Sequence, residues 1–272
     1  MVKYTRDFQD SLEFVQKVDP SLKSIVDNHD FPAFFASNTE EKSSFHYLVR
    51  NILGQQVSGA AGRAILKRFL DLTLKNDPPE VSFPAPERIL EFSVEELRSA
   101  GLSIRKAEYV RGLSQAYLDS ILSDEILEAA DDDEVVDKIV SIRGLGPWTA
   151  QMFLIFYLHR RDVFSPGDIG VQRGFRRYVK ERPHLLKEEL EELALPLSPG
   201  KSRKAQARPS VPADLKNMER IVARFSPCRT AFQMILWKIS DIQMDYIEGR
   251  NDEEAKSEPQ TPEASPKKRK TR

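Results

Sequence analysis

A short glycine-rich stretch is the part of the sequence whose chemical use is easiest to name. It reads Ile142-Arg-Gly-Leu-Gly-Pro-Trp-Thr-Ala150 and lies between two segments with helical periodicity. Gly144 and Gly146 tolerate positive φ and carry no side chain, so another molecule can approach the backbone closely. Backbone N–H groups at the start of a helix donate well to a phosphate oxygen, because several donors and the helix dipole converge there. The stretch indicates either a phosphate-binding hairpin or an ordinary turn between two helices.

A second candidate for chemistry is a carboxylate that follows this hairpin. Asp168 lies in the stretch Phe164-Ser-Pro-Gly-Asp-Ile-Gly-Val-Gln-Arg-Gly174, where a new helix is expected to start. An aspartate there is most simply an N-cap. The order of hairpin, helix and aspartate favours a second interpretation, in which the carboxylate lies beside the ligand that the hairpin binds.

Helical periodicity predicts the elements that must position these residues. Apolar residues from Phe45 to Leu53 recur on one helical face, and Ser58 is a good N-cap for the next helix. Ser93 and Glu96 form a capping-box pattern before a short helix ending near Gly101. The remaining expected helices span Arg105–Leu118, Asp133–Ile142, Trp148–Leu158, Ile169–Lys180, Lys187–Leu193, Asp214–Arg224, and Ser226-Pro227 onward to near Tyr246. No strand pattern longer than a few residues is found, so the fold class is predicted to be all-α.

Composition excludes several other classes of protein. The chain has 272 residues, 40% hydrophobic and 31% charged, which is typical of a soluble globular protein. No apolar run approaches the ~20 residues that cross a bilayer. With one cysteine and four scattered histidines, we expect no disulfide, no cysteine-ligated metal and no dedicated transition-metal site.

Charge is distributed unevenly although the formal net charge is only −1. Residues 196–212 are rich in Ser, Pro, Gly, Lys and Arg and predict a disordered insertion. Residues 248–272 predict a disordered tail whose last residues, Ser265-Pro-Lys-Lys-Arg-Lys-Thr-Arg272, suit a nuclear import signal. The predicted organisation is an N-terminal helical segment at 1–42, a main domain at 43–247 and the tail, with a nuclear location.

The segment Ile142–Arg177 resembles the helix–hairpin–helix DNA glycosylase superfamily, in which one aspartate in a glycine- and proline-rich loop follows the hairpin. It is most similar to the alkylation-repair branch, the yeast-type 3-methyladenine DNA glycosylases and the bacterial 3-methyladenine DNA glycosylase II. Further stretches match in the same order: Ile52–Ser58, Gly101–Ala107 and Ser226–Trp237. The resemblance implies two packed helical subdomains with the hairpin and a cleft between them.

The resemblance also implies a chemistry for Asp168. Breaking an N-glycosidic bond builds positive charge on the sugar, and a carboxylate beside the sugar stabilises that charge and orients water. Family members that also cut the DNA backbone have a lysine nucleophile where this chain has Trp148, so a monofunctional enzyme is implied. Trp148 and Trp237 match aromatics of the alkyl-base pocket, and Met152 falls where the bacterial relative has a tyrosine. The alternative is that both tryptophans are core residues.

The same resemblance assigns DNA contacts. Gln56 matches the residue that fills the space left by the flipped base, with Gln55 as an alternative and a plain polar loop as the simpler interpretation. The hairpin amides at Gly144 and Gly146 are expected to bind the strand, and the other candidates for this role, which can equally be plain surface charge, are Arg105, Lys106 and Arg173. No cofactor is required, although a Na⁺ or K⁺ ion at hairpin carbonyls near Ile142 and Leu145 is implied.

The implied protein is therefore a monofunctional DNA-3-methyladenine glycosylase of the second type that flips out and excises alkylated purines in base excision repair. We expect a monomer whose partner is double-stranded DNA with damaged bases, and no membrane association. Three alternatives stay open: a non-catalytic helix–hairpin–helix DNA-binding module, a bifunctional glycosylase-lyase for oxidised bases, and a helical interaction protein.

Overall fold

The computed structural model describes residues 6–29, 31, 43–182, 184–185 and 215–240, and every regular element in those ranges is helical. The prediction of an all-α fold is confirmed. The elements are α1 (Arg6–Val18), η1 (Pro20–Leu22), α2 (Lys23–Asn28), α3 (Ser44–Gly54), α4 (Gly59–Thr73), α5 (Pro86–Leu90), α6 (Val94–Ser99), α7 (Ile104–Leu118), α8 (Asp124–Ala129), α9 (Asp132–Val140), α10 (Pro147–Phe156), α11 (Ile169–Lys180), α13 (Leu215–Ala223) and α14 (Arg229–Ser240).

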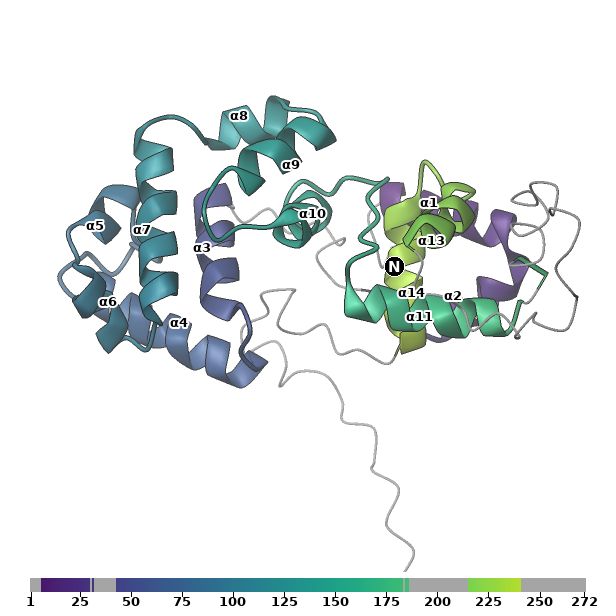
Figure 1. Cartoon of the computed structure of the whole chain (residues 1–272), viewed down its shortest axis with the longest axis horizontal. Coiled ribbons are helices and arrows are strands. Elements are labelled where there is room, and N and C mark those ends of the chain that lie inside the picture. The colour runs from purple at the N-terminus through teal and green to yellow at the C-terminus, as the bar shows by residue number, and fades with distance from the viewer. Residues whose placement is uncertain (1–5, 30, 32–42, 183, 186–214, 241–272) are drawn as a thin grey trace, which may run out of the picture. The chain divides into compact units, whose positions relative to one another are not determined.

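A first group of helices is built around α7. Helices α3, α5 and α6 pack on it, and Figure 1 shows α7 between α3 and the short helices α5 and α6. The apolar face predicted for α3 is buried, with Leu48, Val49, Ile52 and Leu53 all inaccessible to solvent. Helix α10, which carries the residues after the hairpin, packs on α9 and α3. The hairpin is thereby tied to the core of this group.

A second group is built around the crossing of α11 and α14. Gly174 of α11 lies so close to α14 that a Cβ atom would overlap the backbone carbonyl of Leu236. The absence of a side chain therefore lets the two helices touch through their backbones. Helices α1 and α2 also pack on α14, and the buried aromatic rings of this group include Tyr178, Phe225, Phe232 and Trp237.

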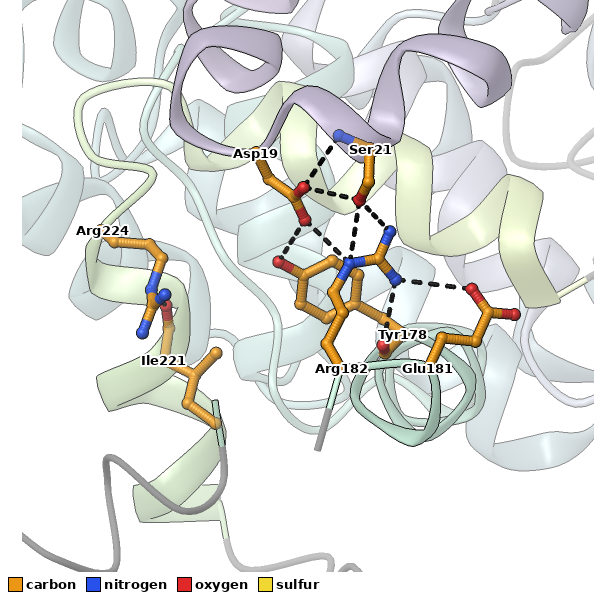
Figure 2. A network of polar contacts seen from close by, with 7 residues as sticks. All are labelled: Asp19, Ser21, Tyr178, Glu181, Arg182, Ile221 and Arg224. Carbon is orange, nitrogen blue, oxygen red and sulfur yellow. Dashed lines mark hydrogen bonds and ion pairs between the residues drawn. The ribbon is translucent and has the colours of Figure 1, made fainter. Parts of the chain in front are cut away.

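A polar network ties the end of α11 to the N-terminal helices (Figure 2). The hydroxyl of Tyr178 and the Nε of Arg182 both donate to Oδ2 of Asp19, each at 2.9 Å. Burial opposes ionisation of Asp19, but hydrogen bonds from Ser21 and Tyr178 and the charge of Arg182 outweigh it and hold its pKa below the ordinary value. The carboxylate therefore joins η1 to α11.

Helix starts are largely as the sequence predicts. Oγ of Ser58 accepts from the amide of Ala61, and Ser93 and Glu96 make both bonds of a capping box. Two short helices were not predicted, α5 and α8, because five and six residues are too few for a clear periodicity.

The predicted start of the last helix at Ser226-Pro227 is wrong. Helix α14 begins at Arg229, and the hydroxyl of Ser226 donates to Asp162 at 2.8 Å instead of capping the helix. Asp162 takes over part of the capping role, since its Oδ1 accepts from the backbone amide of Arg229 at 3.2 Å. The cap thus comes from a segment distant in sequence, which a local pattern does not reveal.

Several predictions concern residues outside the described ranges. These are the helix at Lys187–Leu193, the insertion at 196–212, the tail at 248–272 with its basic cluster, and the last residues expected in the final helix. The domain boundaries at residues 42 and 247 and the cleft between the subdomains also stay predictions. In the described ranges, no helix has the length and apolar character to cross a bilayer, and His, Cys, Asp and Glu side chains form no cluster of three suited to a metal ion.

Candidate active site

The two hairpin glycines meet different surroundings in the loop between α9 and α10. Gly144 has φ +99°, and a Cβ atom on it would overlap the ring of Tyr109. Gly146 has an ordinary extended conformation, and a Cβ atom there would meet nothing within 4 Å. The fold therefore requires glycine at Gly144, whereas the backbone at Gly146 is simply left open.

The turn after α3 contacts the hairpin through a side-chain hydrogen bond. The side-chain amide of Gln55 donates to the carbonyl of Gly144 at 2.9 Å, and the amide of Leu145 donates to the carbonyl of Ile142 at 3.0 Å. The guanidinium of Arg143 lies over the Tyr109 ring, 5.7 Å from its centre. The structure thus gives Gln55 a role in positioning the hairpin, and its alternative role as the residue that fills the space left by a flipped base stays a prediction.

The start of α10 presents backbone donors beside the open glycine. Gly146 is the N-cap and has no side chain to satisfy the first amides, and Pro147 occupies the first turn. The amides of Trp148 and Thr149 have no acceptor within their own helix, because the first N–H groups of any helix lack one. This is the geometry that binds a phosphate oxygen.

Asp168 is both an N-cap and the meeting point of the two tryptophans. Its Oδ1 accepts from the amide of Val171 at 2.8 Å and from the indole Nε1 of Trp237 at 2.9 Å. Its Oδ2 accepts from the indole Nε1 of Trp148 at 2.8 Å. Each carboxylate oxygen has room for about two donors, so these bonds fill Oδ1 and leave one lone pair of Oδ2 for a substrate or water.

The predicted pocket residues differ sharply in exposure. Trp148 is 37% exposed, whereas Trp237 is 1% exposed and Met152 is fully buried. The ring of Trp237 stacks on Phe156 with centroids 5.9 Å apart. In this structure Trp148 alone of the three presents a surface that a base could contact. The core interpretation fits Trp237 and Met152, although Trp237 also donates to the carboxylate.

The hairpin and Asp168 lie within a segment that matches a known protein family. The model of the HhH-GPD superfamily of base excision DNA repair proteins matches residues 49–199, which include the hairpin and Asp168. The chain belongs to this superfamily.

Similar proteins of the HhH-GPD superfamily cover most of the chain. A DNA-3-methyladenine glycosylase of Saccharomyces cerevisiae is 30% identical over 258 residues, which is 91% of this chain and 84% of that protein. The crystal structure of a DNA-3-methyladenine glycosidase from Bacillus halodurans matches with a TM-score of 0.62 and 26% identity, over 85% of this chain and 89% of the other. A Schizosaccharomyces pombe 3-methyladenine DNA glycosylase in complex with abasic DNA has the same fold, with a TM-score of 0.61 and 24% identity over 86% of this chain and 97% of the other.

The predicted DNA contacts of this HhH-GPD protein fall into two sets. Gln56 is exposed at the tip of the turn between α3 and α4, with φ +56°, and Arg105 and Arg173 are exposed on α7 and α11. Lys106 is different, because its ammonium donates to the α3 carbonyl of Leu53 at 2.7 Å and burial lowers its pKa. The structure gives Lys106 a capping role at the end of α3, and its contact with a DNA phosphate stays a prediction.

Two functional candidates were missed in the sequence. Tyr109 is the ring that supports Gly144, and Gln233 is a fully buried side chain that holds the loop before Asp168. Both act through contacts with residues far along the chain. A glutamine within the apolar run Ala231–Trp237 is the local signal that could have drawn attention to Gln233.

Proposed function

We propose that the chain is a monofunctional DNA glycosylase that hydrolyses the N-glycosidic bond of alkylated purines, with 3-methyladenine as the representative base. The observation that carries this proposal is Asp168, whose carboxylate accepts both indole N–H groups while α10 begins at a glycine hairpin. Membership of a base excision repair superfamily supports the reaction class, and the names of the relatives from S. cerevisiae and B. halodurans support the base.

The two carboxylate oxygens divide the work in this proposal. Oδ1 is saturated by Val171 and Trp237 and serves as the anchor. Oδ2 keeps a lone pair for the sugar, where it stabilises the oxocarbenium-like charge that forms as the base leaves, and for the attacking water. An N3-alkylated purine already carries positive charge, so it leaves without a second acid on the protein.

Trp148 supports both the base specificity and the single activity. Its exposed indole offers a face to a cationic base, an attraction worth about 0.5–2 kcal/mol. An indole cannot form a Schiff base with the sugar, so the backbone is left uncut after the base is released. Trp148 would then contact the base on one side and Oδ2 of Asp168 at its Nε1.

The DNA strand would be held by the α10 amides, with Arg105 and Arg173 as charged contacts and Gln56 at the vacated base position. Each is exposed or at a helix start in the structure. A Na⁺ or K⁺ ion at hairpin carbonyls near Ile142 and Leu145 stays a proposal: the carbonyl of Ile142 accepts a hydrogen bond from the amide of Leu145, which leaves a second lone pair for a cation. No step above depends on it. The second glycosylase type, a monomer and a nuclear location likewise stay proposals.

The test is a base-release assay on a duplex with one 3-methyladenine-type lesion, with hypoxanthine and undamaged duplexes in parallel. We expect free base and an intact strand that breaks only when the abasic site is treated with alkali. The matched control is Asp168→Asn, which keeps the N-cap acceptor but removes the charge; it should bind the duplex and release no base. An immediate nick would indicate a lyase, and binding without release by the unmodified protein would indicate a DNA-binding module.

A further inference from the structure

One face of α14 carries polar side chains where an apolar core is expected. Thr230, Gln233 and Trp237 are spaced so that they share a face of the helix, and their exposed fractions are 2%, 0% and 1%. We call these three residues the α14 row. Buried polar groups are kept in proteins when each has a partner, so the partners of the row indicate its purpose.

The partners form one continuous segment that ends at Asp168. The hydroxyl of Thr230 donates to the carbonyl of Arg160 at 2.8 Å and accepts from the amide of Val163 at 3.0 Å. Trp237, at the other end of the row, donates to Asp168 at 2.9 Å. The segment from residue 160 to residue 168 therefore runs beside α14 in the same direction, and about every turn of the helix forms hydrogen bonds with it.

Gln233 forms hydrogen bonds with the middle of this segment. Its Oε1 accepts from the backbone amide of Ser165 at 2.6 Å, and its Nε2 donates to the hydroxyl of Ser165 at 3.4 Å. The turn that follows is closed by the amide of Asp168, which donates to the carbonyl of Ser165 at 3.0 Å. A shift of Ser165 along α14 would thus move Asp168 with it.

Helix α11 restricts the same turn from the other side. The side-chain amide of Gln172 donates to the carbonyl of Pro166 at 2.9 Å. The contact of Gly174 with the backbone of Leu236 sets the separation of α11 and α14 next to Trp237. Both helices that flank the turn are therefore in fixed contact with it and with each other.

We propose that the α14 row sets the position of Asp168 for base release, with Gln233 and Trp237 as positioning residues that act through the carboxylate. The row specifies which oxygen stays free, because Trp237 occupies Oδ1 and leaves the open lone pair on Oδ2. This inference rests on the proposed glycosylase function.

The test measures the single-turnover rate of base release, the affinity for a duplex with an abasic analogue, and the melting temperature. Gln233→Met removes both bonds to Ser165, and Trp237→Phe removes the bond to Oδ1. We expect each to lower the rate by about 10- to 100-fold, because small misplacements of reacting groups have effects of that size, while DNA affinity stays within about twofold. Thr230→Val, farther from Asp168, should lower the rate only a few-fold, and Thr230→Ser, which keeps the hydroxyl, should restore it.

The control variant must lower the stability of the protein without removing a hydrogen bond of the α14 row. Tyr178→Phe removes the hydroxyl bond to Asp19 in the same group of helices, at the far end of α11. It should lower the melting temperature and leave the rate unchanged. If Tyr178→Phe slows release as much as Gln233→Met at matched stability, the row is merely structural and the inference fails. The same holds if Gln233→Met and Trp237→Phe release base at the unmodified rate, which leaves the glycosylase function standing. No release by the unmodified protein would overturn both.

Discussion

Asp168 accepts hydrogen bonds from two regions of the molecule, α10 and α14, which differ in solvent exposure and in the residues around the donor. On the α10 side, Trp148 is 37% exposed and follows an open glycine hairpin. On the α14 side, Trp237 is 1% exposed and continues a row of buried polar residues. Both indoles donate to the same carboxylate, at 2.8 and 2.9 Å.

The difference separates an exposed side, which would meet DNA under the proposed function, from a buried side that is enclosed by the protein. A donor on the exposed side can be replaced by water or by a ligand, so its bond to Oδ2 can be exchanged as substrate enters. A donor on the buried side has no such replacement, and losing it leaves Oδ1 short of a partner in a dry site. We therefore expect substitutions on the α14 side to slow the chemical step more than substitutions of Trp148 do, and substitutions of the open hairpin glycine to weaken binding.

The strongest test of the buried side is Gly174→Ala. The added methyl group would overlap the backbone of Leu236, so α11 and α14 must separate. We expect a loss of about 1–3 kcal/mol in the free energy of unfolding, since overpacking commonly has this effect, together with loss of base release because Trp237 moves from Asp168. Chemical denaturation and the base-release assay measure the two effects. Retained activity would show that α14 does not set the position of the carboxylate.

The counterpart on the exposed side is Gly146→Ala. The backbone there suits any residue and the new methyl group meets no protein atom within 4 Å, so the free energy of unfolding should change by less than about 0.5 kcal/mol. If a phosphate approaches this backbone, losing one such contact weakens DNA binding about tenfold. Fluorescence anisotropy with a labelled duplex checks this. Gly144→Ala is the comparison, and it should reduce stability as well because it collides with Tyr109.

The contrast between the two sides also explains what could be predicted from sequence. The hairpin, Trp148 and Asp168 lie within a single short stretch, so their types and spacing, together with the family resemblance, predicted a candidate site. The caps at Ser58 and Ser93 were predictable for the same reason, since a cap bonds to a residue only three positions away.

The buried side depends on pairs that no local pattern connects. Gln233 and Ser165 are 68 positions apart, and Lys106 and Leu53 are 53 apart. Lys106 was a candidate contact to the DNA backbone by resemblance, and the structure shows its ammonium donating to the carbonyl of Leu53 at the end of α3. Trp237 was assigned to the base pocket by resemblance. In the structure its indole N–H donates to Asp168 and its ring stacks on Phe156, two contacts with residues distant in sequence.

A smaller effect is expected from Trp148→Phe. The ring that faces a base is kept, and the lost N–H can be replaced at Oδ2 by water because the site is open. We expect base release to slow by about three- to tenfold, the value of one hydrogen bond, which is less than for Trp237→Phe. Single-turnover rates of the two variants, measured side by side, decide the matter. An equal or larger loss in Trp148→Phe would mean that the exposed indole, and not the buried one, fixes the carboxylate.

The smallest effect on base release is expected from Asp19→Asn. Asp19 contacts Tyr178 and Arg182 at the C-terminal end of α11 (Figure 2), whereas Asp168 caps the N-terminal end of that helix. The pKa of Asp19 is lowered in the folded protein, so its ionised form stabilises the fold above the unfolded value of about 3.9, and that contribution is lost as pH falls through the lower folded pKa. Asp19→Asn should therefore be less stable than the unmodified protein at neutral pH, and the two should converge in acid. Thermal melts between neutral pH and the acid range measure this, and the rate of base release at neutral pH should not change. A constant stability difference down to the most acidic condition would show that the carboxylate charge plays no part in holding α11, and a slower release would extend the positioning of Asp168 along the whole helix.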